Sequence, residues 1–404
     1  MIKKNRIAKA AFCCELCIAA VGAFTGCSDD KNISEPVSIN TSETTKAVEQ
    51  TESSTQTGAE VMMQSIPITS DNAKLQSRTV TKDSILWLVQ SGSAAEFTVS
   101  GKNASLALAG SSAIKDNETH LPRYAVYVDD KLICDVVMDK QEETVSLWED
   151  TDRTAVVKVM LLSEAQFGGV GIRTVNVESN SAQPVTPTDK ASLKIEFIGD
   201  SITCAYGVEG EFGDTFSTAT ENFTKSYAYL TAKALDADYT TCCYSGYGIV
   251  SGFSADGSKN GKDLLPDCYG MSSNFADYGT EWDFSEQCDV VVVNLGTNDI
   301  NYVAADPEAH GKEFTNGYKA FLQTVRAKRP DAAIICTVGT MGGDDVYKLI
   351  EAAIVELDDE NITSFFSPQQ SPLDDMGTDG HPSKKTQQYS ADILTDKIRN
   401  ILAK

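Results

Sequence analysis

The stretch KIEFIGDSITCAYG, residues 194–207, decides how the second half of this 404-residue chain is interpreted. It begins as a short apolar run typical of a buried strand and leads directly into Gly199, Asp200 and Ser201. A flexible residue, a carboxylate and a hydroxyl are thereby placed at the end of a strand. In open α/β sheets, ligands bind beyond the carboxyl ends of the strands, so this strand end is a candidate functional site.

The segments after this stretch alternate between strand and helix patterns. We expect strands at LKIEFI, YTTCCYS, VVVVNLG, AAIICTV and ITSFF. Two intervening segments carry apolar residues at helical spacing, on faces made of Phe314, Tyr318, Phe321 and Val325 and of Val346, Leu349, Ile350, Ala353 and Leu357. This alternation predicts a three-layer α/β/α domain with a parallel sheet, which we assign to residues 190–404.

Residues 65–180 follow a different pattern, with short β-like runs and no helical pattern between them. Asp129-Asp130-Lys131 lies between two alternating apolar runs and predicts a hairpin turn. Evenly spaced strands without helices favour an all-β sandwich or jelly roll. We interpret Trp87 and Trp148 as core residues of this domain, although a separate sugar-binding role is an alternative.

The N-terminus has the features of an export signal over residues 1–26. Basic residues precede an apolar run, and small residues precede Cys27, as in a lipoprotein signal peptide of bacteria. We expect lipidation at Cys27 and an extracytoplasmic place, either on the cell surface or secreted; a transmembrane anchor is the alternative. Residues 27–64 are rich in Ser, Thr, Glu and Gln and predict a disordered tether.

The composition excludes some classes of partner. The net charge is −24, and loss of residues 1–26, with four basic and one acidic residue, leaves −27. A chain this acidic repels phosphate backbones and anionic lipid surfaces. We therefore expect that it does not bind nucleic acid and that its substrate is neutral or cationic. We expect contact with a membrane only through the lipid anchor. We expect a monomer.

The spacing of the cysteines does not indicate a metal site. Beyond Cys27, seven cysteines remain, and an odd number leaves at least one thiol unpaired unless chains are cross-linked. The pairing itself stays open. Because no cysteine pair has zinc-ligand spacing near a histidine, we expect neither a metal nor another cofactor.

Reactive residue types lie at three strand ends and before the last helix, in FIGDSI, CYSGYG, VNLGTNDI and TDGHPS. Of the three histidines, His120 belongs to the β domain and His310 opens a helix, so His381 is the candidate base. In an acyl transfer, His381 would remove the proton of the nucleophile Ser201, and Asp379 or a backbone carbonyl would orient the imidazole. Pro382 is placed to open the last helix.

The negative oxygen of a tetrahedral intermediate needs preorganised donors. The candidates are the N–H groups of Ser201 and Gly248 and the side-chain amide of Asn298. Gly246 stands two residues from Gly248 and is an alternative to it.

Each of these residues also has a simpler interpretation. Ser201 could cap the following helix, and Asn298 could be a turn former. Asp200 and Asp299 are expected to brace the strand-end turns rather than act as acids. Three aromatic residues either line a sugar site or belong to the core: Tyr206, Tyr247 and Trp282.

The four motifs, in this order, resemble those of the SGNH (GDSL-type) hydrolases over about residues 190–404. The resemblance implies the roles given above for Ser201, Gly248, Asn298 and His381. The chain departs from the pattern in one respect, because the position three residues before His381 is Thr378 and the aspartate comes two before it. A catalytic triad and a dyad both remain open.

With the β domain in front, residues 65–404 resemble carbohydrate esterase family 2. That resemblance implies a metal-independent serine esterase that removes acetyl groups from xylan or a related carbohydrate. Two alternatives remain: a GDSL-type hydrolase of lipid or short-chain esters, and a non-catalytic glycan-binding surface lipoprotein. The polysaccharide, the hydroxyl position and the preference for polymer or oligosaccharide are left open.

Overall fold

The computed structural model describes residues 61–116, 120–371 and 376–403. The predicted signal at 1–26, Cys27 and nearly all of the predicted tether lie outside these residues. Strand β1 begins at Met62, ahead of the predicted start of the β domain at residue 65. Among the described helices, none is both long and apolar enough to cross a membrane.

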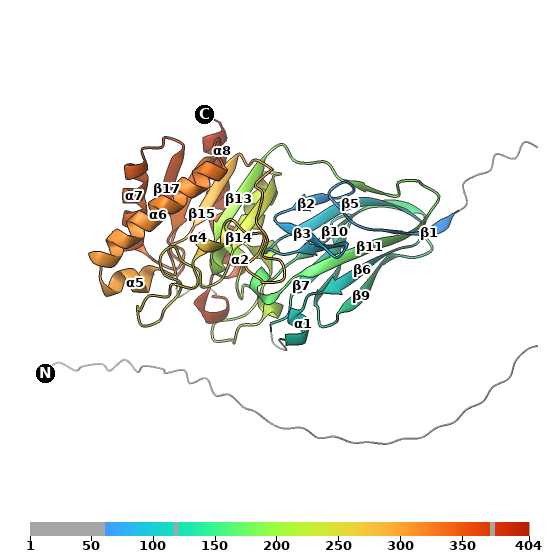
Figure 1. Ribbon diagram of the computed structural model, residues 1–404, viewed down its shortest axis with the longest axis horizontal. Helices are drawn as coiled ribbons and strands as arrows, with labels where there is room; N and C mark the ends of the chain where they lie inside the picture. The colour runs from blue at the N-terminus through green and yellow to red at the C-terminus, as the bar shows by residue number, and fades with distance from the viewer. Residues whose placement is uncertain (1–60, 117–119, 372–375, 404) are drawn as a thin grey trace, which may run out of the picture. The chain divides into compact units, whose positions relative to one another are not determined.

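The N-terminal part is built from two antiparallel six-stranded sheets (Figure 1, blue to green). The first has the order β3-β4-β11-β6-β9 with β1 beside β11, and comprises β1 (Met62–Ile66), β3 (Thr79–Lys82), β4 (Ile85–Leu88), β6 (Ala104–Gly110), β9 (Glu142–Trp148) and β11 (Val170–Ser179). The second has the order β12-β5-β10-β7-β8 with β2 beside β5, and comprises β2 (Lys74–Gln76), β5 (Ala94–Gly101), β7 (Arg123–Val128), β8 (Lys131–Val137), β10 (Arg153–Leu161) and β12 (Val185–Pro187).

The two sheets pack face to face through alternate residues of their strands. Phe97 and Val99 of β5 are fully buried and share one core cluster with Leu106 and Val175 of the other sheet. The predicted hairpin joins β7 to β8, and Asp129 and Asp130 both have the positive φ, 49° and 61°, that a two-residue turn of this kind requires. This part is therefore the predicted β-sandwich.

The C-terminal part contains a five-stranded, fully parallel sheet of order β14-β13-β15-β16-β17. Its strands are β13 (Lys194–Gly199), β14 (Asp238–Cys243), β15 (Val290–Asn294), β16 (Ala333–Val338) and β17 (Ile362–Phe366). The described helices of the chain are α1 (Ala113–Asp116), which lies in the sandwich part, and α2 (Ser201–Cys204), α3 (Tyr227–Ala234), α4 (Leu265–Cys268), α5 (Ile300–Ala305), α6 (Ala309–Lys328), α7 (Asp344–Leu357) and α8 (Lys384–Leu402). Short 3-10 turns occupy Ala165–Phe167, Thr218–Thr220, Phe223–Lys225 and Thr378–Gly380.

Helices cover both faces of this sheet, because successive strand residues point to opposite sides. Phe197 packs with Tyr227 of α3 and Ile398 of α8, whereas Ile198 packs with Phe314 of α6 and Ile350 of α7. The result is the predicted α/β/α arrangement, and the predicted fold class is confirmed.

One helix boundary differs from the prediction. Helix α8 begins at Lys384, and the Ser383 side chain accepts a hydrogen bond from the N–H of Thr386 at 3.4 Å. Pro382 therefore precedes the helix instead of opening it, because a serine supplies the better cap.

A buried ion network ties the sandwich to the parallel sheet. Glu196 of β13 is fully buried and contacts Arg78, between β2 and β3, at 3.3 Å and Arg329, after α6, at 2.6 Å. Arg78 also donates to the carbonyls of Tyr269 and Met271 at 2.7 and 2.5 Å. One buried carboxylate is thus the shared ion-pair partner of two buried guanidinium groups.

We predict that Glu196→Ala lowers the free energy of unfolding by about 3–5 kcal/mol, because two buried guanidinium groups lose their counter-ion. Glu356→Ala, which breaks the exposed pair of Glu356 with Lys319, is the matched control and is expected to change it by less than about 1 kcal/mol. Urea unfolding measures both. If the two substitutions lowered the free energy of unfolding equally, the buried ion network would not be the larger contribution to stability.

Candidate active site

Three neighbouring strands end at one edge of the parallel sheet. The last residue of β13, Gly199, is in register with Cys243 of β14 on one side and with Asn294 of β15 on the other. The chain continues from these ends into the GDSI, YSGYG and GTND motifs. The motifs that lie far apart in the sequence are therefore brought to one edge.

Ser201 is the first residue of α2 and is only 5% exposed. The helix begins here because the Asp200 carboxylate accepts a hydrogen bond from the N–H of Ile202 at 3.0 Å. The first N–H groups of a helix have no acceptor within it, and none of the described residues supplies one for the N–H of Ser201. The serine thus offers a hydroxyl and a free donor together.

His381 is the partner of this hydroxyl. Its Nε2 lies 2.9 Å from Ser201 Oγ, and its Nδ1 lies 3.2 Å from the backbone carbonyl of Thr378. Because a carbonyl only accepts, Nδ1 carries the hydrogen and Nε2 is free to accept the serine proton. Burial lowers the pKa of His381 to about 4, against the opposing effects of the Thr378 carbonyl and the Asp379 charge.

Of the two orienting groups that the sequence left open, Asp379 and a backbone carbonyl, the geometry favours the carbonyl. The Asp379 carboxylate does not hold the imidazole but accepts a hydrogen bond from the Tyr206 hydroxyl at 2.9 Å. The backbone carbonyl of Thr378, three residues before His381, takes the orienting position instead. Asp379 has a φ of 54°, in the left-handed region. Ser201, His381 and this carbonyl form a dyad with a main-chain acceptor.

The oxyanion donors also differ from the prediction. The N–H of Gly248 donates to the carbonyl of Asp263 at 3.0 Å and is not available to a ligand. Among the described residues, no acceptor is found for the N–H of Gly246, which has a φ of 83° and open space where a side chain would be. Gly246 therefore replaces Gly248 as the candidate donor.

One of the two side-chain amide hydrogens of Asn298 is hydrogen-bonded within the protein, and the other is free to donate. Its Nδ2 donates to the carbonyl of Tyr247 at 2.8 Å, which links the GTND motif to the turn that holds Gly246. Since a side-chain amide has two N–H groups, the second can face a ligand. The residue is 8% exposed, so its orientation is fixed by packing as well.

Two buried aspartates hold the surrounding backbone, as predicted. Asp299 accepts hydrogen bonds from the N–H groups of Ile249, Val250 and Ser251 at 2.9–3.0 Å. Burial raises the pKa of Asp299 to about 6 and that of Asp200 to about 7. Both carboxyl groups are enclosed by backbone and have no open face toward a substrate.

The three predicted aromatic contacts fall in different places. The Tyr206 ring lies 4.2 Å from the His381 ring and stacks on Phe216 at 3.9 Å. Tyr247 is half-buried in the turn beside Asn298. Trp282 packs against the core, with its ring 5.6 Å from the Arg78 guanidinium, so its prediction as a sugar contact is not supported.

The sequence left two elements of this site as alternatives that it could not choose between. The Thr378 carbonyl is a main-chain group, so no residue type distinguishes it from the Asp379 carboxylate. Gly246 lies in the same CYSGYG motif as Gly248, and the choice between them depends on a long-range bond to Asp263 that spacing does not reveal.

The chain was compared with known proteins. Residues 197–389 match the GDSL-like Lipase/Acylhydrolase family. The chain is 34% identical over 265 residues to Cellulase/esterase CelE of Acetivibrio thermocellus, a match that covers 63% of this chain and 30% of CelE. It is 27% identical over 284 residues to an Acetylxylan esterase / glucomannan deacetylase of Cellvibrio japonicus, covering 69% of this chain and 76% of that protein.

A solved structure covers both parts of the chain. The family two carbohydrate esterase of Clostridium thermocellum, determined in complex with cellohexaose, is 28% identical with a TM-score of 0.70. The match covers 82% of this chain and 99% of that one. In sequence motifs and in fold, the chain thus resembles the SGNH hydrolases of carbohydrate esterase family 2.

We predict that kcat/KM for a small neutral ester depends on His381 in its unprotonated form. Because the pKa is lowered to about 4, kcat/KM rises about tenfold per pH unit below that value and is level between about pH 6 and pH 7. Hydrolysis of p-nitrophenyl acetate across this range, with circular dichroism to verify folding, measures the profile. An acid limb centred near the ordinary histidine value would contradict the burial of this imidazole.

Proposed function

We propose that this protein is a serine esterase that removes O-acetyl groups from carbohydrates, of the acetyl-xylan esterase type. The observation that carries the proposal is the contact of 2.9 Å between Ser201 Oγ and His381 Nε2 at the end of the parallel sheet. Acyl transfer needs a nucleophile and a base in hydrogen-bond reach and donors for the oxyanion, and the unengaged N–H groups of Ser201 and Gly246 follow strands that end at the same edge of the sheet.

In the first half of the reaction, Ser201 Oγ attacks the acetyl carbonyl carbon and its proton passes to His381 Nε2. The carbonyl oxygen becomes negative and is bound by the N–H groups of Ser201 and Gly246 and by the Asn298 amide. The bond to the sugar oxygen then breaks, and the imidazolium returns its proton to that oxygen. The free sugar hydroxyl leaves, and acetate remains esterified to the serine.

In the second half, water takes the place of the sugar. His381 removes a proton from the water as it attacks the acetyl-serine, and the same donors hold the oxyanion. Collapse of the intermediate releases acetate and returns the proton to Ser201 Oγ. The Thr378 carbonyl keeps the imidazole in one tautomer throughout, since it holds the hydrogen on Nδ1.

The choice of a carbohydrate is supported by the relatives and by the surface chemistry. One of them is named Cellulase/esterase CelE and another Acetylxylan esterase / glucomannan deacetylase. Tyr206, stacked on Phe216 beside the catalytic imidazole, is an aromatic surface of the kind that packs on sugar rings, and Tyr247 is a second candidate. The net charge of −24 favours a neutral polymer over an anionic lipid surface.

We predict that the wild-type protein releases acetate from acetylated xylan or glucomannan and that Ser201→Ala lowers kcat at least about 10³-fold, because the nucleophile is lost. Acetate release from a panel of acetylated xylan, glucomannan and simple sugar acetates is the measurement. A preference for octanoyl over acetyl esters would instead favour a lipid-type hydrolase, and no hydrolysis of any ester would favour a glycan-binding protein.

Asp379→Asn is the matched control in this assay. Because its carboxylate contacts Tyr206 and not the imidazole, the substitution is expected to keep kcat within about tenfold of wild type. A loss as large as that of Ser201→Ala would restore Asp379 to the orienting role.

We also propose that Cys27 attaches the protein to the bacterial surface, because the residues before it form a lipoprotein-like motif. We predict that Cys27→Ser moves the protein from the membrane fraction to the soluble one without changing kcat, because the acyl chains at Cys27 would no longer anchor it. Fractionation and mass analysis of the mature N-terminus test this. Retention of the variant in the membrane fraction would favour the uncleaved apolar segment as the anchor.

A further inference from the structure

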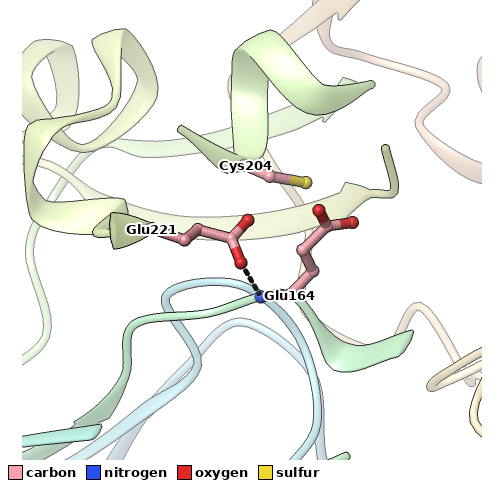
Figure 2. Close-up of side chains that lie close together, drawn as sticks. All are labelled: Glu164, Cys204 and Glu221. Atoms are coloured by element: carbon pink, nitrogen blue, oxygen red, sulfur yellow. Dashed lines mark hydrogen bonds between the residues drawn. The ribbon is translucent and has the colours of Figure 1, made fainter. Parts of the chain in front are cut away.

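A cluster of three buried side chains lies where the sandwich meets the candidate active site. Glu164, Cys204 and Glu221 are fully buried, and one carboxylate oxygen or sulfur from each lies within 4.8 Å of the others. Figure 2 shows the two carboxyl groups facing each other with the thiol of Cys204 beside them. Glu164 comes from the loop after β10, Cys204 from the end of the helix that carries Ser201, and Glu221 from the loop before α3.

Glu164 holds the residue that precedes the candidate oxyanion donor. Its carboxylate accepts a hydrogen bond from the N–H of Ser245 at 2.7 Å and another from the Ser245 hydroxyl. The Gly246 N–H belongs to the next peptide unit along the chain, so once Ser245 is held at its N–H and its hydroxyl, only the φ and ψ angles of Ser245 separate this N–H from the fixed position. The far side of the same turn is fixed by the N–H of Phe253, which donates to the Gly246 carbonyl at 2.8 Å.

Glu221 holds Glu164 in turn. One of its oxygens accepts the N–H of Glu164 at 3.0 Å, while the other, Oε1, is buried without a partner among the described residues. Two ionised carboxylates that face each other, both fully buried, would repel strongly. A single proton placed between them removes the repulsion and gives Oε1 a partner.

The electrostatics of the pair agree with a shared proton. Burial raises the pKa of both acids, and for Glu221 the charge of Glu164 raises it further. The Ser245 N–H and O–H, together with Gln166, whose Nε2 lies 2.8 Å from Glu164 Oε2, stabilise the remaining negative charge on Glu164. Glu221 is therefore the member that carries the proton.

We propose that Glu164, supplied by the β-sandwich, is a positioning residue for the oxyanion hole, and that it holds Ser245 and hence the Gly246 N–H only while it shares a proton with Glu221. This inference rests on the esterase activity proposed above. It assigns to the sandwich a part in the reaction that is distinct from sugar binding.

The other titratable groups around the two glutamates do not provide a positive charge that would offset two carboxylates. They are the thiols of Cys204 on α2 and Cys243 on β14, and the hydroxyls of Tyr206 and Tyr247. Burial raises the pKa of Cys204, Tyr206 and Tyr247. These three groups are thus neutral near pH 7, and the proton must come to the carboxyl pair itself.

The test compares two isosteric substitutions, with kcat and KM for p-nitrophenyl acetate measured from pH 5 to pH 10. Glu164→Gln replaces one acceptor by a donor that opposes the Ser245 donors, so kcat is expected to fall about 30- to 100-fold while KM changes less than about threefold. Glu221→Gln reproduces the protonated acid, with an amide N–H for the shared proton, and is expected to keep kcat within about threefold at pH 7. Wild type should lose kcat as the proton leaves at alkaline pH, and Glu221→Gln should not.

Glu209→Gln is the matched control, since Glu209 is another carboxylate that links the two parts, at 2.7 Å from Arg123, but does not touch the turn. It is expected to leave kcat within about twofold of wild type. If Glu164 acts through Ser245, Ser245→Ala also lowers kcat, and the double variant Glu164→Gln/Ser245→Ala is no slower than Glu164→Gln alone.

Two readouts separate failure of this inference from failure of the proposed function. The infrared spectrum of wild type minus that of Glu221→Gln should contain the carbonyl band of a protonated acid at pH 7, whatever the substrate. Phosphonylation of Ser201 by a fluorophosphonate should slow in Glu164→Gln in parallel with kcat. Absence of that band, equal losses in Glu164→Gln and Glu221→Gln, or a stoichiometric metal ion that is lost in Glu221→Gln would each overturn the proposal.

Discussion

The register of three parallel strands is the constraint on which the rest of the site depends. Because Gly199 is level with both Cys243 and Asn294, the chain leaves all three strands at the same edge. A shift of one residue in β13 would send Ser201 to the opposite face and separate it from the turn of Gly246. The buried apolar faces on both sides of the sheet, which alternate residue by residue, are what prevent such a shift.

The sandwich completes this sheet and does not merely precede it. Strand β14 lies at the edge of the sheet and would expose unpaired backbone groups. Residues of the sandwich part bind them: the side chain of Gln76 accepts the N–H of Tyr239 at 2.9 Å, and that of Ser77 accepts the N–H of Thr241 at 3.0 Å. Together with the Arg78 to Glu196 contact, these bonds make the sandwich a structural partner of the site rather than a detachable binding module.

The features that could be predicted from the sequence are those encoded by neighbouring residues or by the order of the motifs. The alternation of strands and helices, the Asp129-Asp130 turn and the pairing of Ser201 with His381 could be predicted, since periodicity and motif order carry them. The choice between Gly246 and Gly248 and the replacement of Asp379 by a carbonyl could not, because each depends on a hydrogen bond formed only in the folded chain. The contact between Glu164 and Glu221 could not be predicted either. Both residues lie in loops, and no sequence pattern near them indicates a buried pair of acids.

The electrostatic logic of the site follows from its burial. A carbonyl behind His381, in place of a carboxylate, avoids burying a further charge but gives the imidazolium less support, so more of the stabilisation must come from the oxyanion donors. A negative charge close to these donors reduces how well they stabilise the oxyanion. Two ionised glutamates, one of them bonded to Ser245 next to Gly246, would oppose the developing oxyanion, whereas one shared proton halves their charge and leaves a single acceptor to fix the backbone. The acid pair and the carbonyl-supported histidine are thus two consequences of the same requirement, that a buried site keep its net negative charge small before the reaction creates more.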